Sequence, residues 1–170
     1  MRIIESSGGG DGAGADGEVT VGVIADTHGV LRPQARDALA GCALIVHAGD
    51  IGSPDVIREL EALAPVTAVR GNVDVGPWAS GFPETATVEA GGALLYVLHD
   101  LEQLDLNPAA AGMAVVVSGH THHATVEDRD GVLYVNPGSA GPRRFHHPVS
   151  VAVVRMAPGS VSAELVDLEV

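Results

Sequence analysis

The sequence contains no lysine, and each of its 9 basic residues is an arginine. The absence of lysine excludes a Walker A nucleotide site, a Schiff-base mechanism and a lysine general base, whatever the fold. Against those arginines stand 22 acidic residues, which give a formal net charge of −13. A protein that binds the phosphate backbone of nucleic acid needs a basic face, so we expect no such partner. Clustered carboxylates favour divalent cations instead.

Cysteine is scarce, and the sequence shows neither a long apolar run nor the pattern of a secretory leader. Cys42 is the one cysteine, so no disulfide can form within the chain, and this fits a reducing compartment. No apolar run approaches the roughly 18 residues of a membrane span, and residues 1–5 lack the apolar core of a signal peptide. We therefore expect a cytoplasmic protein with no membrane partner, and leave open whether it forms homo-oligomers.

The chain has 170 residues, of which 46% are hydrophobic, and this fits one folded domain. Residues 6–17 are glycine, serine, aspartate and alanine, which cannot bury enough apolar surface to offset the entropy of ordering. We predict a flexible glycine-rich tail over residues 1–17 and a single domain over 18–170. A phosphate-binding loop is the alternative for the glycine-rich run, but no predicted helix follows it.

Short apolar runs alternate with helical patterns in the first half of the domain. Buried strands are predicted at 20–25, 43–47 and 66–69, and helices at 32–40 and 54–63. Further strands, several separated by glycine turns, are predicted at 85–89, 93–98, 114–118, 125–127, 132–135, 150–156 and 162–166. The fold class is α/β, with two mixed β-sheets packed face to face and helices outside.

Five predicted strands end in side chains that can bind metals. These side chains belong to Asp26, His28, Asp50, Asn72, His99, His120 and His122. Since the carboxyl ends of parallel strands meet at one edge of a sheet, we expect the seven to share one pocket. If the local chain is extended, both members of Asp26-x-His28 and of His120-x-His122 point the same way.

Seven oxygen and nitrogen ligands are too many for one small ion and suit two. Carboxylate and imidazole without thiolate favour manganese, iron or zinc, with nickel or cobalt as substitutes, and manganese is our first choice. The carboxylate of Asp50 can bridge two ions. Two ions about 3.5–4 Å apart can hold a hydroxide and neutralise the oxygens of a phosphoryl group.

The series DTH, GD, GN, H and GHTH, in this order, resembles the calcineurin-like metallophosphoesterase superfamily. GNVD, and the NPGS that follows GHTH, resemble its compact YfcE and archaeal MJ0936-like phosphodiesterase branch. The resemblance covers residues 18–170 and implies a four-layer α/β/β/α sandwich. It also implies a phosphodiesterase that hydrolyses a small phosphodiester or nucleotide-type substrate by in-line attack of a metal-bridging hydroxide.

The resemblance also implies a role for each candidate ligand. The first metal site would consist of Asp26, His28, Asp50 and His122, and the second of Asp50, Asn72, His99 and His120. Asp50 would bridge the ions, Asn72 would also hold the phosphoryl oxygens, and these two residues and His99 would be the catalytic ones.

The sequence departs from the family pattern at two positions. Asp100 follows His99, where the family often has glycine. Val73 stands where larger members carry a histidine proton donor, so we expect better turnover of aryl or nucleotide-type leaving groups than of alkyl ones.

Several polar residues have two interpretations. His47 suits a supporting or packing role better than ligation. His146 and His147 suit a solvated turn better than a further metal site, and His123 either faces solvent or has a role at the site. Arg143 and Arg144 are either surface arginines or contacts for a substrate phosphate. Asp74 either orients a ligand or caps a turn.

A protein-interaction scaffold similar to VPS29, with little or no turnover, is the alternative function. That hypothesis predicts eroded ligands, whereas all seven positions hold competent side chains. A metallo-β-lactamase is set aside because HxHxDH is lacking, and a Rossmann dehydrogenase because no GxGxxG follows the first strand.

Overall fold

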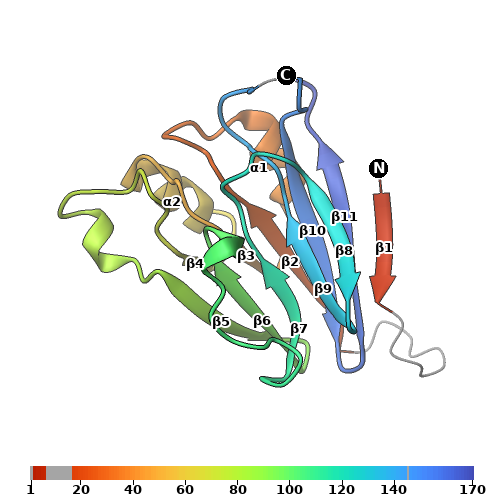
Figure 1. Ribbon diagram of the computed structural model, residues 1–170. Helices are drawn as coiled ribbons and strands as arrows, with labels where there is room; N and C mark the ends of the chain where they lie inside the picture. The colour runs from red at the N-terminus through yellow and green to blue at the C-terminus, as the bar shows by residue number, and fades with distance from the viewer. Residues whose placement is uncertain (1, 7–16, 145) are drawn as a thin grey trace.

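The computed structural model describes residues 2–6, 17–144 and 146–170 (Figure 1). Two β-sheets lie face to face, one of six strands in the order β1-β11-β10-β2-β3-β4 and one of five in the order β5-β6-β7-β9-β8. The first sheet comprises β1 (Arg2–Ser6), β2 (Val19–Ile24), β3 (Leu44–His47), β4 (Val66–Ala68), β10 (Ser150–Ala157) and β11 (Ser160–Asp167). The second comprises β5 (Thr85–Ala90), β6 (Ala93–Leu98), β7 (Met113–Val117), β8 (Thr125–Arg129) and β9 (Val132–Asn136).

Each sheet contains a set of three parallel strands. In the first sheet β2, β3 and β4 are parallel, and β10 joins β2 antiparallel. In the second sheet β6, β7 and β9 are parallel, with β5 and β8 antiparallel at the edges. The carboxyl ends of each parallel set therefore lie at one edge of its sheet, where ligand sites of α/β proteins form.

The main core lies between the two sheets. It is built from small β-branched and aliphatic side chains, among them Val23, Val46, Val97, Val117 and Leu133, all fully buried. Continuous apolar runs form β2 and β3 because these strands are covered on both faces.

Both α-helices, α1 (Pro33–Leu39) and α2 (Pro54–Glu61), pack on the outer face of the first sheet. Ser53 caps α2 by accepting a hydrogen bond from the N–H of Asp55, and Pro54 occupies the first turn, as the sequence pattern predicts. Val56, Ile57 and Leu60 form its buried face. No helix in the described part of the chain is long and apolar enough to span a membrane.

The outer face of the second sheet is covered differently. Tyr96, Leu98 and Val116 pack there beneath Leu101 and Leu104, from the 3₁₀ helix η2 (Leu101–Gln103) and the segment after it. A second 3₁₀ helix, η1 (Ala79–Gly81), precedes β5. The predicted α/β class with two mixed sheets is thus confirmed, and over the second sheet the outer layer is a 3₁₀ helix and loop instead of α-helices.

The N-terminal end differs from the prediction. Residues 2–6, expected to belong to a flexible tail, form β1 and pair antiparallel with β11. Ser6 lies opposite Val161 and Arg2 opposite Leu165. The rest of the predicted tail, residues 7–16, lies outside the described residues. The strand was missed because a five-residue segment before a glycine-rich run carries little pattern of its own.

Candidate metal centre

The candidate ligands lie on loops at the carboxyl ends of parallel strands from both sheets. Asp26, Asp50 and Asn72 follow β2, β3 and β4, whereas His99 and His120 follow β6 and β7. The convergence therefore arises from two facing sheet edges, and not from a single parallel sheet. Hydrogen bonds join the edges. Among them, the N–H of His120 donates to Asp26 Oδ2 at 3.1 Å, and Nδ1 of His99 lies 2.8 Å from the carbonyl oxygen of Ala48.

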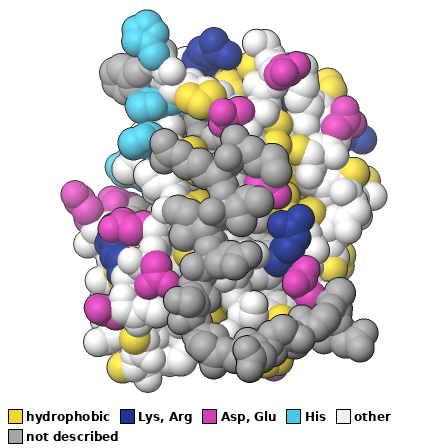
Figure 2. Space-filling model, turned by 90° about the vertical axis from the view of Figure 1, so that its right-hand side faces the viewer, with side chains coloured by type: hydrophobic (Ala, Val, Ile, Leu, Met, Phe, Trp, Pro, Cys, Tyr) yellow, Lys and Arg dark blue, Asp and Glu magenta, His cyan; other side chains and the backbone are white. Residues whose placement is uncertain are grey.

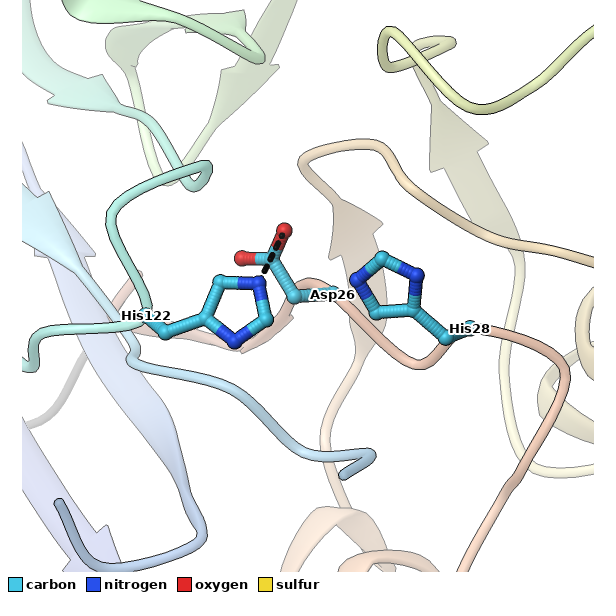
Figure 3. A group of neighbouring side chains, drawn as sticks. All are labelled: Asp26, His28 and His122. Carbon is cyan, nitrogen blue, oxygen red and sulfur yellow. Dashed lines mark ion pairs between the residues drawn. The ribbon is translucent and has the colours of Figure 1, made fainter. Parts of the chain in front are cut away.

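Asp26, His28 and His122 form the first group of side chains. Their candidate ligand atoms all lie within 4.8 Å of one another. Asp26 and His28 come from the loop after β2, and His122 approaches from the opposite side (Figure 3). Asp26 Oδ1 is 3.5 Å from Nε2 of His122, and Asp26 and His122 are both buried. The group therefore offers one carboxylate and two imidazoles around a common point.

Asp50, His99 and His120 form the second group, within the same 4.8 Å limit. Asn72 belongs with them, because its Oδ1 lies 3.0 Å from Nε2 of His99 and 3.2 Å from Nδ1 of His120. The two imidazole nitrogens are themselves 3.3 Å apart. The group is thus closely packed with nitrogen and oxygen donors, and His120 leaves it open to solvent.

Asp50 also reaches the first group. Its Oδ2 lies 3.3 Å from Nε2 of His99 and 3.8 Å from Nε2 of His28. Its other oxygen, Oδ1, accepts a hydrogen bond from the N–H of Val73 at 3.1 Å, which fixes the orientation of the carboxylate. One carboxylate oxygen therefore faces a histidine of each group.

The backbone is left-handed, and not extended, at five of the seven candidate ligands. Positive φ angles occur at Asp26 (55°), His28 (47°), Asp50 (54°), His120 (72°) and His122 (61°). Among the described residues that are not glycine, the other one with positive φ is Asp130, in a hairpin turn. The condition of an extended chain is therefore not met at either pair. Asp26 and His28 still lie in the same group, whereas His120 and His122 lie in different groups.

Such angles are uncommon outside glycine and cost free energy, so their concentration here indicates a functional constraint. They persist because hydrogen bonds on both sides hold the loops. The N–H of Asp26 donates to the carbonyl of Gly49, and the N–H of His28 donates to that of Asp50.

Unpaired buried atoms test whether these residues fit metal ions. Asp26 Oδ1, Nε2 of His28 and Nδ1 of His122 are buried without a hydrogen-bond partner. An unsatisfied buried polar atom is costly, and native proteins leave few of them without a reason. A cation bound to the first group would satisfy Asp26 and His28 directly, so the donor set fits a divalent metal.

Burial and neighbouring charges change the pKa values in the site. Burial raises the pKa of Asp26 to about 7 and lowers that of His122 to about 4. Burial also lowers the pKa of His28. At His99 burial acts downwards, but hydrogen bonds to Asp50 and Ala48 outweigh it and raise the pKa. His28 and His122 are therefore neutral and ready to ligate at neutral pH.

Asp74, left open between two roles, is a clamp for the backbone. It is buried, and its carboxylate accepts hydrogen bonds from the N–H groups of Ile51 (3.1 Å), Gly52 (2.9 Å) and Gly71 (2.8 Å). These three groups flank Asp50 and Asn72 on their two loops. Asp74 thus fixes the distance between the loops without pointing at either group.

His47, the last residue of β3, supports the loops that carry Asp26 and Asp50. It is fully buried, and burial lowers its pKa to about 3, so it is neutral. Its Nδ1 accepts from the N–H of Gly49 at 3.1 Å, which assigns the proton to Nε2, 3.0 Å from the hydroxyl of Thr27. That hydroxyl donates to the carbonyl of Ile51 at 2.8 Å. His47 therefore has the supporting role favoured from the sequence.

The NPGS segment after β9 holds the histidine loop. The amide of Asn136 donates to the carbonyl of Gly119 at 3.0 Å and to the hydroxyl of Thr121 at 3.1 Å. The hydroxyl of Ser139 donates to the carbonyl of Asp26 at 3.1 Å. The NPGS motif was part of the family resemblance in the sequence. In the structure its hydrogen bonds hold the loop of His120 and His122 and the backbone of Asp26, and so help to position both groups of candidate ligands.

Four of the polar residues with two interpretations are exposed, namely Arg143, Arg144, His123 and His146, and His147 is half-buried. Burial is the main cause of the low pKa of His122, and the charge of Arg144 lowers it further. The same charge also lowers the pKa of Asp26 and His28, alongside the larger effect of burial. Arg144 is thus close enough to act on the first group. The ring of His123 stacks on that of His147 at 4.8 Å.

Figure 2 shows histidine side chains gathered at one margin of the molecule, with acidic side chains near them.

Two cavities open beside the second group. The smaller, of about 200 Å³, is lined by residues that include Asn72, His99 and His120. The larger, of about 630 Å³, extends from His120 between η2 and the outer face of β8 and β9. Asp100, which caps η2 by accepting from the N–H of Glu102, lines both.

The family of the chain follows from comparison with known proteins. Residues 19–159 match the calcineurin-like phosphoesterase superfamily domain, so the chain belongs to that superfamily. It is 35% identical over 158 residues to a probable metallophosphoesterase of Methanothermobacter thermautotrophicus, covering 86% of this chain and 91% of the relative. It is also 32% identical over 137 residues to a phosphodiesterase of Methanocaldococcus jannaschii, MJ0936, covering 69% of this chain and 82% of that protein. The resemblance stated from the motifs is thereby confirmed.

Solved structures agree on the fold. Vacuolar protein sorting 29 from Cryptosporidium parvum superposes with a TM-score of 0.76 at 22% identity, over 89% of this chain and 92% of that one. At this identity the likeness concerns the fold alone. The same architecture therefore occurs in a protein named for sorting, which bears on the alternative function.

Proposed function

We propose that the protein is a dinuclear metal-dependent phosphodiesterase that hydrolyses a small phosphodiester or nucleotide-type substrate by in-line attack. One observation carries the proposal: Oδ2 of Asp50 lies 3.8 Å from a histidine nitrogen of the first group and 3.3 Å from one of the second. A carboxylate so placed is suited to bridge two cations. Family membership supports the phosphoesterase class.

The first ion would be held by Asp26, His28, Asp50 and His122, and the second by Asp50, Asn72, His99 and His120. Manganese is the first choice, with iron, zinc, nickel and cobalt compatible with the same nitrogen and oxygen donors. When bound, the pair of ions supplies an activated water and neutralises charge on the phosphoryl oxygens.

The chain's own residues bind and orient the substrate. Asn72 carries an amide at the mouth of the smaller cavity, where its N–H₂ can donate to a phosphoryl oxygen while its Oδ1 faces His99 and His120. Arg144 contributes a positive charge beside the first group, where a phosphodiester carries its negative charge. Val73 supplies a backbone N–H to Asp50 and no acid, so leaving groups that are stable as anions are favoured.

The alternative is a protein-interaction scaffold with little or no turnover, similar to VPS29. The observation that favours it is the shared fold of the Cryptosporidium parvum protein. Against it stand the complete set of candidate ligands and their unpaired buried atoms, which a scaffold does not need. The two functions differ in whether bound metal stimulates hydrolysis.

The test combines elemental analysis with hydrolysis of bis-p-nitrophenyl phosphate in manganese. We expect two equivalents of metal per chain and manganese-dependent release of p-nitrophenol. Asp50→Asn keeps an acceptor for Val73 but removes the bridging charge, so it should lose one equivalent and about 100-fold or more in rate. Asp37→Asn, on the exposed face of α1, is the matched control and should behave as wild type. Metal binding without hydrolysis of any diester would favour the scaffold.

A further inference from the structure

The cavity of about 630 Å³ beside His120 is large enough for a small organic group. Ligand pockets typically measure about 300–1,000 Å³. It begins at the second group, because His120 lines both this cavity and the one that contains Asn72. From there it continues along the outer face of β9 past Tyr134. A group attached to a phosphorus atom at the metal centre can therefore extend into it.

The charges along this cavity are unequal at its two ends. At the far end Arg129 is paired with Glu127 at 2.9 Å and lies over the ring of Tyr134, 4.6 Å from its centre. These charges neutralise each other. At the near end Asp100 and Glu102 line the wall beside His120, and neither takes part in an ion pair among the described residues. The wall that Asp100 and Glu102 form at the near end therefore carries two uncompensated carboxylates.

This arrangement selects among substrate arms. An arm with a further phosphate or carboxylate would meet uncompensated carboxylates, whereas a cationic arm would be attracted to them. The net charge of −13 on the whole chain acts in the same direction. The hydroxyls of Thr121 and Thr125 add hydrogen-bonding groups to the wall.

We infer that this cavity receives one alcohol arm of the substrate and that the arm it fits carries a positive charge, as an amino alcohol or a quaternary ammonium alcohol does. The inference rests on the proposed phosphodiesterase function. It adds the class of alcohol that the enzyme accepts, and it assigns specificity to Asp100 and Glu102 on η2.

The test uses three phosphate monoesters that differ in one arm. Phosphorylcholine has a cationic arm, 3,3-dimethylbutyl phosphate is its neutral isostere, and 3-carboxypropyl phosphate has an anionic arm. Binding to the manganese-loaded protein is measured by calorimetry, and inhibition of bis-p-nitrophenyl phosphate hydrolysis is measured separately. We expect phosphorylcholine to bind about fivefold or more tightly than the isostere, and the anionic ester to bind weakest.

Glu102→Gln removes one carboxylate and keeps the shape of the wall. It should reduce the preference for phosphorylcholine over the isostere several-fold, whereas Glu61→Gln, on α2, should leave this preference unchanged. Equal binding of the three esters, or tightest binding of the anionic one, would overturn the inference while hydrolysis continues. Absence of hydrolysis would instead contradict the proposed function, and the calorimetric order would still test the charge of the arm.

Discussion

The carboxylate of Asp26 accepts a hydrogen bond from the backbone N–H of His120, 3.1 Å away and 94 positions later in the chain. Asp26 belongs to the first group of candidate ligands and His120 to the second. One oxygen of Asp26 thus holds the loop of the second group, while its other oxygen, Oδ1, lies in the first group without a hydrogen-bond partner. The two groups are therefore connected before any ligand binds, and a substitution in one should alter the geometry of the other.

Metal binding should release protons, more at pH 6 than at pH 8. Asp26, with a pKa of about 7 caused by burial, is mostly protonated at pH 6 and must lose its proton to ligate. His99, whose pKa is raised, adds to the release. His122, with a pKa of about 4, adds almost none, and the lowered pKa of His28 reduces its share. Manganese affinity should therefore fall as the pH falls below 7.

Calorimetry in buffers of different ionisation enthalpy counts these protons. In Asp26→Asn the number released at pH 6 should fall by about one. Equal release at pH 6 and pH 8 in the wild-type protein would show that Asp26 is already ionised in the free site.

Gly71→Ala should disable the bridge between the groups. A methyl group on Gly71 would collide with Oδ1 and the backbone nitrogen of Asp50, so the carboxylate must move. A displacement of about 1 Å in a catalytic group can cost roughly 100-fold in rate, and we expect a loss of that order. Gly81→Ala is the matched control, since a methyl group there meets nothing within 4 Å. Full activity and metal content in Gly71→Ala would contradict the role given to Asp50.

Asp74→Ala should destabilise the fold and weaken metal binding together. The substitution leaves the N–H groups of Ile51, Gly52 and Gly71 without their acceptor, at a cost of about 3 kcal/mol. Loss of a supporting group typically weakens metal affinity about tenfold or more. Urea unfolding and manganese titration measure the two effects. Asp128→Ala, which removes one exposed hydrogen bond to Gly131, should cost about 0.5 kcal/mol or less. Similar results for the two variants would refute the clamp.

Arg144→Ala should raise KM for phosphodiesters by about fivefold to tenfold, with a smaller effect on kcat, because it removes a charge that binds substrate phosphate. Arg143→Ala changes the neighbouring exposed arginine and is the matched control. Steady-state kinetics on bis-p-nitrophenyl phosphate separates KM from kcat. If both variants shift KM equally, the effect comes from the loss of any positive charge on this loop and not from a specific role of Arg144.

Local patterns in the sequence predicted most elements of the fold. The strand at 93–98 has the predicted bounds, and the helix predicted to start at Pro54 does start there. The seven candidate ligands could be proposed because each lies in a segment that follows a predicted strand, which sequence alone can show. Membership of a known superfamily was also evident from their order.

What the sequence could not show depends on contacts between distant segments. The left-handed backbone of Asp26 and His28 is held by carbonyl groups from the neighbouring loop, so the chain is not extended there. The three acceptor contacts of Asp74 and the pairing of β1 with β11 likewise join residues far apart in the chain. No local pattern encodes such partners.

Anomalous diffraction from a crystal grown with manganese tests the central claim most directly. We expect two peaks about 3.5–4 Å apart, one beside Asp26, His28 and His122 and one beside Asn72, His99 and His120, with the carboxylate of Asp50 touching both. A single peak, or manganese bound away from these side chains, would contradict the account.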